Sequence, residues 1–187
     1  MLKVEKTLII AEAGVNHNGS ITEAKRLVDE AKRAGADIVK FQTFRAESLV
    51  TKNASKASYQ VRETGPGESQ FEMLKKLELT FEEFLELAEY CDKKHIEFLS
   101  TAFDEECLEF LVKKTRIQRI KIPSGELTNG PLIAAASKTG LPLIVSTGMA
   151  TLAEIEEALD VITWVRQGCH GRHAGAFRKR GFFDIGV

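Results

Sequence analysis

Short hydrophobic runs alternate along the chain with longer stretches in which apolar side chains recur every three or four positions. Short runs bounded by turn residues are typical of buried parallel strands. Five of them precede residue 146: Leu8–Ala11, Ile38–Phe41, Ile96–Leu99, Ile120–Ile122 and Leu143–Val145. The pattern therefore predicts five parallel strands.

The stretches between these runs predict helices. Three of them begin with a capping box, in which a hydroxyl residue precedes a glutamate by three positions and both satisfy free backbone N–H groups. The pairs are Ser20 with Glu23, Thr80 with Glu83, and Thr151 with Glu154. A further helix is predicted from Asn129, before Gly-Pro, to about Gly140. Strands alternating with helices predict an α/β fold of five βα units.

One connection is much longer than the others. Residues 44–79 separate the second strand from its helix and contain the turn cluster Gly65-Pro66-Gly67. Long connections in compact domains are functional or disordered. Because this one leaves the carboxyl end of a strand, we expect an active-site loop.

Polar side chains stand at the carboxyl end of every predicted strand, where ligands of parallel α/β folds bind. They are Glu12 to Gly19, Lys40 with Gln42, Ser100-Thr101, Lys121 to Glu126, and Ser146-Thr147-Gly148. Lysines, hydroxyls and helix N-termini suit phosphate and carboxylate oxygens, whereas carboxylates suit hydroxyl binding or proton transfer. Glycine-rich nucleotide fingerprints are absent. The set favours cofactor-free chemistry on a phosphorylated or sugar-like substrate.

Each of these residues also has a purely structural interpretation. Lys40 extends its ammonium to the rim of the fold or belongs to a functional site, and Lys121 has the same two interpretations. Ser146 and its neighbours bind a ligand or merely cap a helix. For Glu12 a functional role is favoured, because burying a carboxylate without a partner costs free energy. His17, among Asn and Gly residues, fits a turn and a ligand role equally well.

Composition narrows the class of protein. The 187 residues are 43% hydrophobic and 28% charged, with a formal charge of −1, which excludes a disordered chain and gives no reason to expect nucleic acid as a partner. No apolar run approaches the ~20 residues of a membrane span. Three cysteines without CxxC spacing favour a reducing, cytoplasmic location. The length is below the ~250 residues of a complete (β/α)8 barrel.

Charge is unevenly distributed. Residues 164–187 hold five Lys or Arg, one acidic residue and five glycines, which leaves 26 − 5 = 21 basic and 27 − 1 = 26 acidic residues in 1–163. We therefore divide the chain into a folded part, 1–163, and a basic, irregular tail, 164–187. The tail is typical of a shifted reading frame or a truncation, and its Cys169, His170 and His173 form only a weak zinc-binding pattern.

Five segments at the strand ends form a set of motifs that occur in order along the chain. They are IAEAGVNHNG (10–19), VKFQTF (39–44), FLSTAFD (98–104), KIPSGE (121–126) and STGM (146–149). These segments resemble the sialic acid synthase family, which includes N-acetylneuraminate, legionaminate and pseudaminate synthases, and the similarity runs over about residues 7–162.

This resemblance implies a (β/α)8 TIM barrel, here incomplete, with about five βα units. It implies a transferase that condenses phosphoenolpyruvate with an N-acetylmannosamine-type sugar, an N-acyl-hexosamine, to give a nine-carbon 2-keto acid and phosphate. Family members use a divalent metal, Mn or Mg, and are homodimers with a further antifreeze-like domain. By resemblance to the family motifs, five residues are expected to bind phosphoenolpyruvate: Lys40, Thr101, Lys121, Ser124 and Ser146. Glu126, Glu12 and Gln42 are expected to be catalytic, Glu126 as the acid, base or orienting carboxylate, and Glu12 and Gln42 toward the sugar or the metal shell.

The chain departs from the family at two points. Ala102 replaces a common proline after Ser-Thr, in a predicted turn. The similarity ends before the family's metal-binding histidines, so we expect no metal ligands here and impaired activity. Two alternatives remain: a Schiff-base TIM-barrel aldolase with Lys40 or Lys121 as the nucleophile, and a non-catalytic truncated relative.

Overall fold

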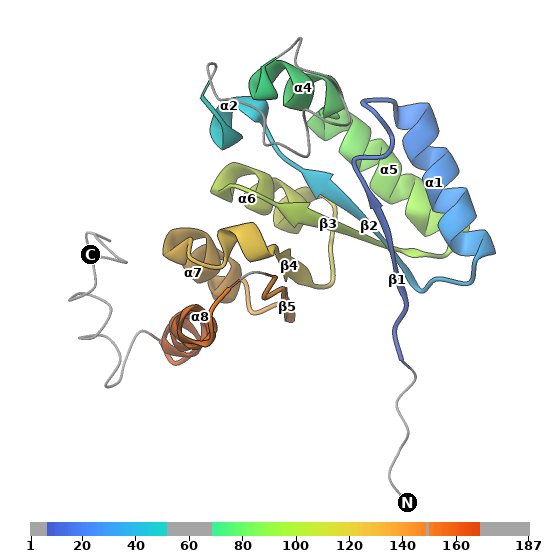
Figure 1. The fold of residues 1–187 in the computed structure, drawn as a ribbon. Coiled ribbons are helices and arrows are strands. Elements are labelled where there is room, and N and C mark those ends of the chain that lie inside the picture. Colours follow the sequence, from blue (N-terminus) through green and yellow to red (C-terminus); the bar gives the residue numbers. More distant parts are fainter. Residues whose placement is uncertain (1–6, 52–68, 149, 169–187) are drawn as a thin grey trace, which may run out of the picture.

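A computed structural model describes residues 7–51, 69–148 and 150–168. Five parallel strands lie side by side in chain order (Figure 1), so each βα unit adds a strand next to the preceding one. The strands are β1 (Ile10–Gly14), β2 (Ile38–Thr43), β3 (Glu97–Ala102), β4 (Ile120–Ile122) and β5 (Leu143–Val145). The predicted α/β fold of five βα units is confirmed.

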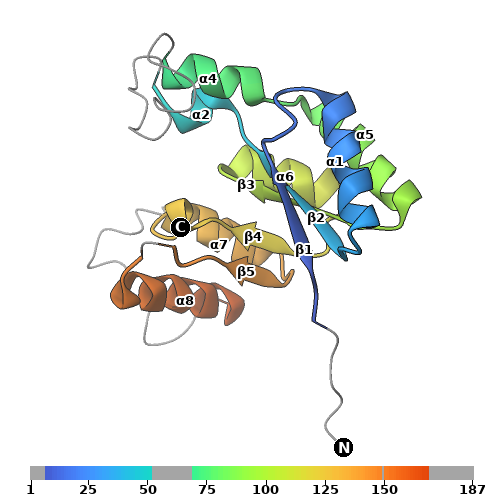
Figure 2. The same ribbon diagram turned by 45° about the vertical axis from the view of Figure 1, so that its right-hand side comes forward.

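The helices follow one side of the curved sheet, with α7 and α8 packed together at the β5 edge and α1 at the β1 edge (Figure 2). They are α1 (Ile21–Arg33), α2 (Ala46–Leu49), α4 (Gln70–Leu77), α5 (Phe81–Lys94), α6 (Glu105–Lys114), α7 (Gly130–Lys138) and α8 (Leu152–Arg166), with a short 3₁₀ helix, η1, over Ser124–Glu126. Thr80 and Thr151 form the predicted reciprocal capping boxes, whereas Ser20 accepts only the Glu23 N–H. A fourth box, Ser69 with Glu72, was not predicted.

The first strand lies further along the chain than predicted. It begins at Ile10 rather than Leu8, because its ladder with β2 starts where Ile10 pairs with Ile38. Leu8 and Ile9 are about half exposed, 49% and 54%. As a result Glu12 lies inside a strand and not after its end. The predicted turn at Ala102 was also wrong, because this residue ends β3, buried and paired with Thr43.

The hydrophobic core lies between the sheet and the helices. Phe41 of β2 stacks on Phe98 of β3, with ring centroids 6.1 Å apart, and both belong to a cluster that includes Phe84 and Leu87 of α5. Cys91, also in this cluster, is free, and burial raises the pKa of its thiol to about 12. Because side chains alternate along a strand, the neighbours of Phe41 point to the opposite face.

The long connection after β2 contains two helices, α2 and α4, in its described part. Arg45 lies over the Phe81 ring, 4.3 Å from its centroid, and Phe81 stacks on Phe110 of α6 at 4.1 Å. The connection is thereby anchored to the outer helices. Its turn cluster, Gly65-Pro66-Gly67, lies outside the described residues.

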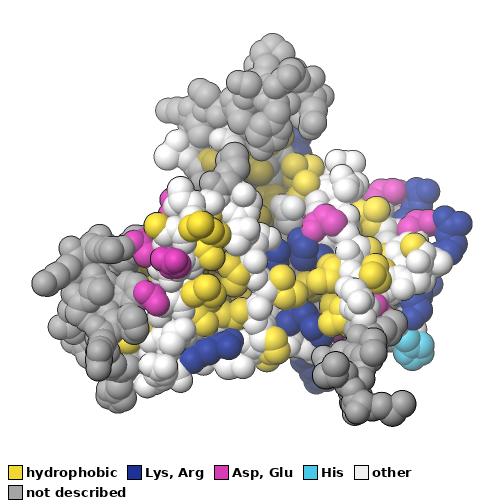
Figure 3. Space-filling view, turned by 60° about the horizontal axis from the view of Figure 1, so that its bottom comes forward, with side chains coloured by type: hydrophobic (Ala, Val, Ile, Leu, Met, Phe, Trp, Pro, Cys, Tyr) yellow, Lys and Arg dark blue, Asp and Glu magenta, His cyan; other side chains and the backbone are white. Residues whose placement is uncertain are grey.

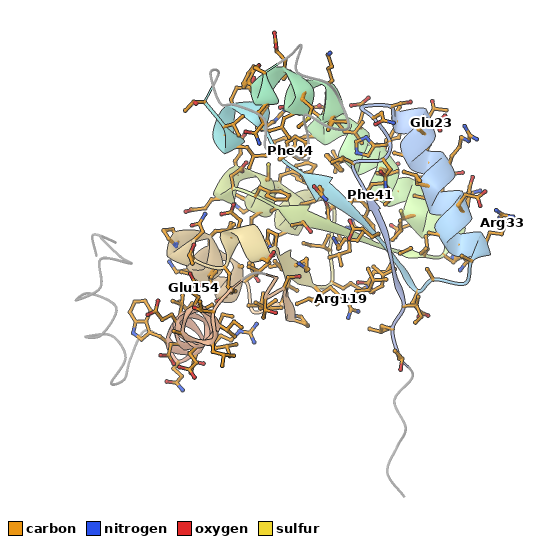
Figure 4. The ribbon with its side chains drawn as sticks, viewed as in Figure 1. Glu23, Arg33, Phe41, Phe44, Arg119 and Glu154 are labelled. Atoms are coloured by element: carbon orange, nitrogen blue, oxygen red, sulfur yellow. The ribbon has the colours of Figure 1, made fainter. Side chains whose placement is uncertain are left out.

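A bidentate ion pair joins β3 to the residue just before β4, at the end of the sheet away from Phe44 (Figure 4). The Arg119 guanidinium donates to both oxygens of Glu97, at 2.6 and 3.0 Å. The side chains are only 22% and 18% exposed. Such planar, two-bond pairs are stronger than single contacts between flexible surface charges.

Replacing Arg119 by methionine is expected to lower the free energy of unfolding by about 1.5 kcal/mol, because the largely buried Glu97 carboxylate loses its partner. Urea unfolding measures this change. The control is Lys113→Met, which removes an exposed pair with Glu109 on α6 and should leave the midpoint unchanged. Equal midpoints for both variants would contradict the prediction.

Both outer strands of the described sheet, β1 and β5, have a single strand neighbour. The space-filling view shows hydrophobic side chains among Lys and Arg side chains on one face (Figure 3). The exposed large hydrophobic residues of the described part are Leu8, Ile9, Leu152 and Leu159.

No described helix combines the length and apolar character needed to cross a membrane.

The division of the chain near residue 163 falls within α8, which continues to Arg166. Residues 164–166 are therefore helical. Residues 169–187 of the predicted tail lie outside the described residues, including the cysteine and histidines of the weak zinc pattern.

Candidate functional site

Parallel pairing brings five of the predicted site residues onto one face of the sheet. Glu12 pairs with Lys40, Gln42 with Thr101, and Thr101 with Lys121. Residues paired in register point to the same side, and Lys40 and Gln42 share a face because they are two positions apart. This face is opposite the one that packs on the helices. Residues from four strands thus form one polar cluster.

Lys40 is the best-connected member of the cluster. Its ammonium forms an ion pair with Glu12, and its Nζ lies 3.5 Å from the Thr101 hydroxyl oxygen. The Lys40 side chain is 13% exposed, whereas that of Glu12 is 52% exposed. Lys40 is therefore a largely buried, paired cation and does not extend to the rim.

Lys121 lies on the next strand but one. Its ammonium donates to the Ile122 carbonyl at 2.9 Å. Burial, and secondarily the positive charge of Lys40, lower the pKa of Lys121, and Glu12 partly opposes this effect. Two ammonium groups close together in a half-buried place favour the binding of an anion.

We expect the affinity for sulfate to fall as the pH rises, and the fall to begin below pH 10.5, the ordinary pKa of lysine. The reason is that Lys121 loses its proton at a lower pH than an ordinary lysine does. Sulfate itself keeps its charge between about pH 7 and pH 11, so only the protein titrates. Lys121→Arg should move the loss to higher pH, since a guanidinium stays protonated. Calorimetric titration across this range tests the prediction, which identical profiles for the two proteins would refute.

The loops after β4 and β5 meet at Ser124. A Cβ on Gly148, whose φ is +43°, would lie 2.4 Å from the Ser124 hydroxyl oxygen. Only glycine allows this approach, so the Ser146 segment lies against Ser124. Ser146 does not cap α8, because Thr151 does. The predicted capping alternative for Ser146 was therefore wrong, whereas its ligand-binding role stays a prediction.

Glu126 lies in η1 and is held by a neighbour that the sequence did not mark as a site residue. The Asn129 side-chain amide donates to Glu126 at 2.7 Å, while its oxygen caps α7 by accepting the Leu132 N–H. In the described part of the chain, no hydrogen bond or ion pair joins Glu126 to either lysine. The available sequence signal was the predicted helix start at Asn129, three residues after Glu126.

Gly14 is a second residue that was missed. It has a φ of +55°, and a Cβ there would lie 3.3 Å from Glu12 Oε1 and 3.4 Å from Gln42 Nε2. The glycine thus leaves room for these two side chains to approach each other. Its place two residues after Glu12, just beyond the predicted strand, was the available signal.

His17 is separate from this cluster. It is fully buried, its Nδ1 accepts the Gly19 N–H at 3.1 Å, and its ring lies 6.2 Å from that of Phe41. Burial lowers its pKa, opposed by Glu83. The neutral imidazole therefore holds the turn after β1, with its proton on Nε2.

Metal ligands are not gathered in the described part of the chain, where no group of three or more His, Cys, Asp or Glu side chains could hold an ion. His17 is engaged through Nδ1, and His95 ends α5. The side chains of the described residues therefore do not assemble a ligand set for a divalent metal.

Comparison with known proteins identifies the family of the chain. A model of the NeuB family matches residues 27–176. The chain is 50% identical over 154 residues to the N,N'-diacetyllegionaminic acid synthase of Legionella pneumophila, covering 82% of this chain and 43% of that protein. It is 48% identical over 159 residues to the synthase of the same name from Campylobacter jejuni, covering 85% and 47%. The chain thus spans about half the length of these relatives.

A solved structure shares the fold. The N-acetylneuraminic acid synthetase of Leptospira borgpetersenii, in complex with citrate, superposes with a TM-score of 0.72 at 33% identity, over 87% of this chain and 52% of that one. The five βα units form part of a TIM-type barrel. The chain belongs to the NeuB family.

Proposed function

We propose that this chain provides the phosphoenolpyruvate-binding part of a synthase that makes a nine-carbon 2-keto acid, a sialic or related nonulosonic acid. The observation that carries the proposal is the cluster of Lys40, Lys121 and Thr101 on one face of the sheet. Two ammonium groups and a hydroxyl match an anion that bears both a phosphate and a carboxylate.

The reaction assigns a task to each group. Carbon 3 of phosphoenolpyruvate forms a bond to the aldehyde carbon of an N-acylated amino sugar, whose oxygen takes up a proton. Water adds at carbon 2, the bond between carbon 2 and the bridging oxygen of the phosphate group breaks, and phosphate leaves as the 2-keto group forms. Lys40, Lys121 and Thr101 hold the anion, and Ser124 and Ser146 add hydroxyl donors. Glu126, fixed by Asn129, orients or transfers the proton.

The names of the relatives support this product class, because they are synthases of legionaminic and N-acetylneuraminic acids. We propose an N-acyl-hexosamine as acceptor, with N-acetylmannosamine and a 2,4-diacetamido sugar as the first two to test. The homodimeric state and the cytoplasmic location remain predictions.

The test combines binding with product analysis. We expect the 187-residue chain to bind phosphoenolpyruvate in a calorimetric titration. With an acceptor sugar it should release phosphate and a 2-keto acid in equal amounts, below the ~1 s⁻¹ of an ordinary enzyme. Phosphate assay and mass spectrometry measure both products. Absence of phosphoenolpyruvate binding by the folded chain would refute the proposal, and turnover at ordinary rates would refute the expected impairment.

A Schiff-base aldolase is the second candidate, favoured by one observation. Burial and the neighbouring Lys40 lower the pKa of Lys121, and both effects activate a lysine amine toward carbonyl groups. Borohydride reduction in the presence of pyruvate separates the candidates, because a synthase of the proposed kind forms no imine. A mass increase confined to Lys121, absent from Lys121→Met, would favour the aldolase.

A further inference from the structure

The ion pair of Glu12 and Lys40 joins two side chains with different access to solvent. Glu12 is 52% exposed and Lys40 is 13% exposed. The carboxylate can therefore leave the pair and be solvated, whereas the ammonium has little access to water. A largely buried ammonium that loses its partner must find another anion, because an unpaired buried charge is costly.

Each member has other polar groups beside it. The Lys40 Nζ already lies 3.5 Å from the Thr101 hydroxyl oxygen. Glu12 Oε1 and Gln42 Nε2 lie 3.3 and 3.4 Å from the position that a Cβ on Gly14 would take, so both side chains border the space beside this glycine. If another anion replaced Glu12 as the partner of Lys40, both the Lys40 ammonium and the Glu12 carboxylate would still have polar groups beside them.

The charges of the cluster favour replacement of Glu12 by an incoming anion. Lys121 experiences both the positive charge of Lys40 and the opposing charge of Glu12. Glu12 thus neutralises part of the positive charge of the cluster when no other anion is near. An incoming phosphate carries more negative charge than one carboxylate and can interact with both ammonium groups.

We infer that Glu12 is a positioning residue that serves as the internal counter-ion of Lys40, and that an incoming phosphate group displaces it toward Gln42. Anion binding then releases the carboxylate for hydrogen bonds to the hydroxyls of a second substrate. The inference rests on the proposed function for the identity of that substrate. The exchange itself requires only the observed pair and a phosphate.

The experiment measures binding of inorganic phosphate by calorimetry at constant ionic strength. Glu12→Gln removes the competing charge and keeps the size of the side chain, so phosphate should bind about fivefold to tenfold more tightly. Glu109→Gln on α6 removes the same charge far from the cluster and should leave the affinity unchanged. Glu12→Ala provides a second test if the glutamine variant is destabilised, and urea unfolding establishes that each variant is folded.

A double variant shows whether the effect passes through Lys40. Glu12→Gln should give a much smaller gain in phosphate affinity in a Lys40→Met background, because no pair with Lys40 remains to be broken and only the weaker effect of Glu12 on Lys121 is left. A gain of equal size there would overturn the inference and indicate a general charge effect. Unchanged or weaker phosphate binding by Glu12→Gln alone would overturn it as well, as would no binding by any of the proteins.

A crystal structure with phosphate gives a direct reading. The inference requires the Glu12 carboxylate to lie beyond 4 Å from Lys40 Nζ when phosphate is bound, and an intact pair would overturn it. Its failure is distinguishable from failure of the proposed function. Tighter phosphate binding by Glu12→Gln in a chain that does not bind phosphoenolpyruvate supports the exchange and refutes the proposed function, while phosphoenolpyruvate binding with an intact pair does the reverse.

Discussion

Replacing Gly19 by alanine is expected to lower the free energy of unfolding by about 3 kcal/mol, from a left-handed backbone and a steric overlap together. Gly19 has a φ of +73°, and a Cβ there would lie 2.2 Å from the Lys76 carbonyl oxygen near the end of α4. A backbone atom cannot rotate away as a side chain can. The turn after β1 or α4 must therefore move, and the bond from Gly19 to His17 is disturbed as well.

Gly35 is the matched control for this prediction. It has a φ of +81°, and a Cβ there would meet nothing within 4 Å. Gly35→Ala therefore carries the backbone strain alone and should cost about 1 kcal/mol. Urea unfolding of both variants separates the two effects. Equal losses would mean that the contact between the turn and α4 is unimportant.

Replacing Lys40 by methionine is expected to weaken phosphoenolpyruvate binding about 100-fold, because a charge-assisted hydrogen bond to the anion is lost. Methionine retains the apolar stem, so the side chain still fills its place beside Thr101. The Glu12 carboxylate left behind is half exposed and can be solvated. Calorimetry with phosphoenolpyruvate measures the change in affinity.

Lys113→Met serves as the charge-matched control, because Lys113 lies on α6, paired with Glu109. It should bind phosphoenolpyruvate as the unaltered chain does. A similar loss of affinity in both variants would mean that only the net charge matters. A loss below about threefold in Lys40→Met would remove Lys40 from the proposed anion site.

The order of strands and helices could be predicted because each element has its own local signal. Runs such as Ile38–Phe41 and boxes such as Thr80 with Glu83 act within a few residues, and the structure confirms both. The predicted start of β1 was wrong because Leu8 and Ile9 are as apolar as a buried strand. Only the pairing of Ile10 with Ile38 shows that these two residues remain exposed.

The site could be predicted in part for a related reason. Alternation of side chains along β2 is a local property, so the sequence alone places Lys40 and Gln42 on one face. The roles of Asn129 and Gly14 were missed, because each depends on what lies beside it in space. Asn129 holds Glu126, and Gly14 makes room for Glu12 and Gln42.

The sequence by itself determined that polar groups stand on successive strands and that the chain has an α/β fold. The tertiary structure decided which of these groups meet. Parallel pairing brings Lys40 to Glu12 and Thr101 toward Lys121 across intervals of many residues, and burial then changes the pKa of Lys121. Local patterns act over a few residues, whereas register and burial arise only when distant strands pack together.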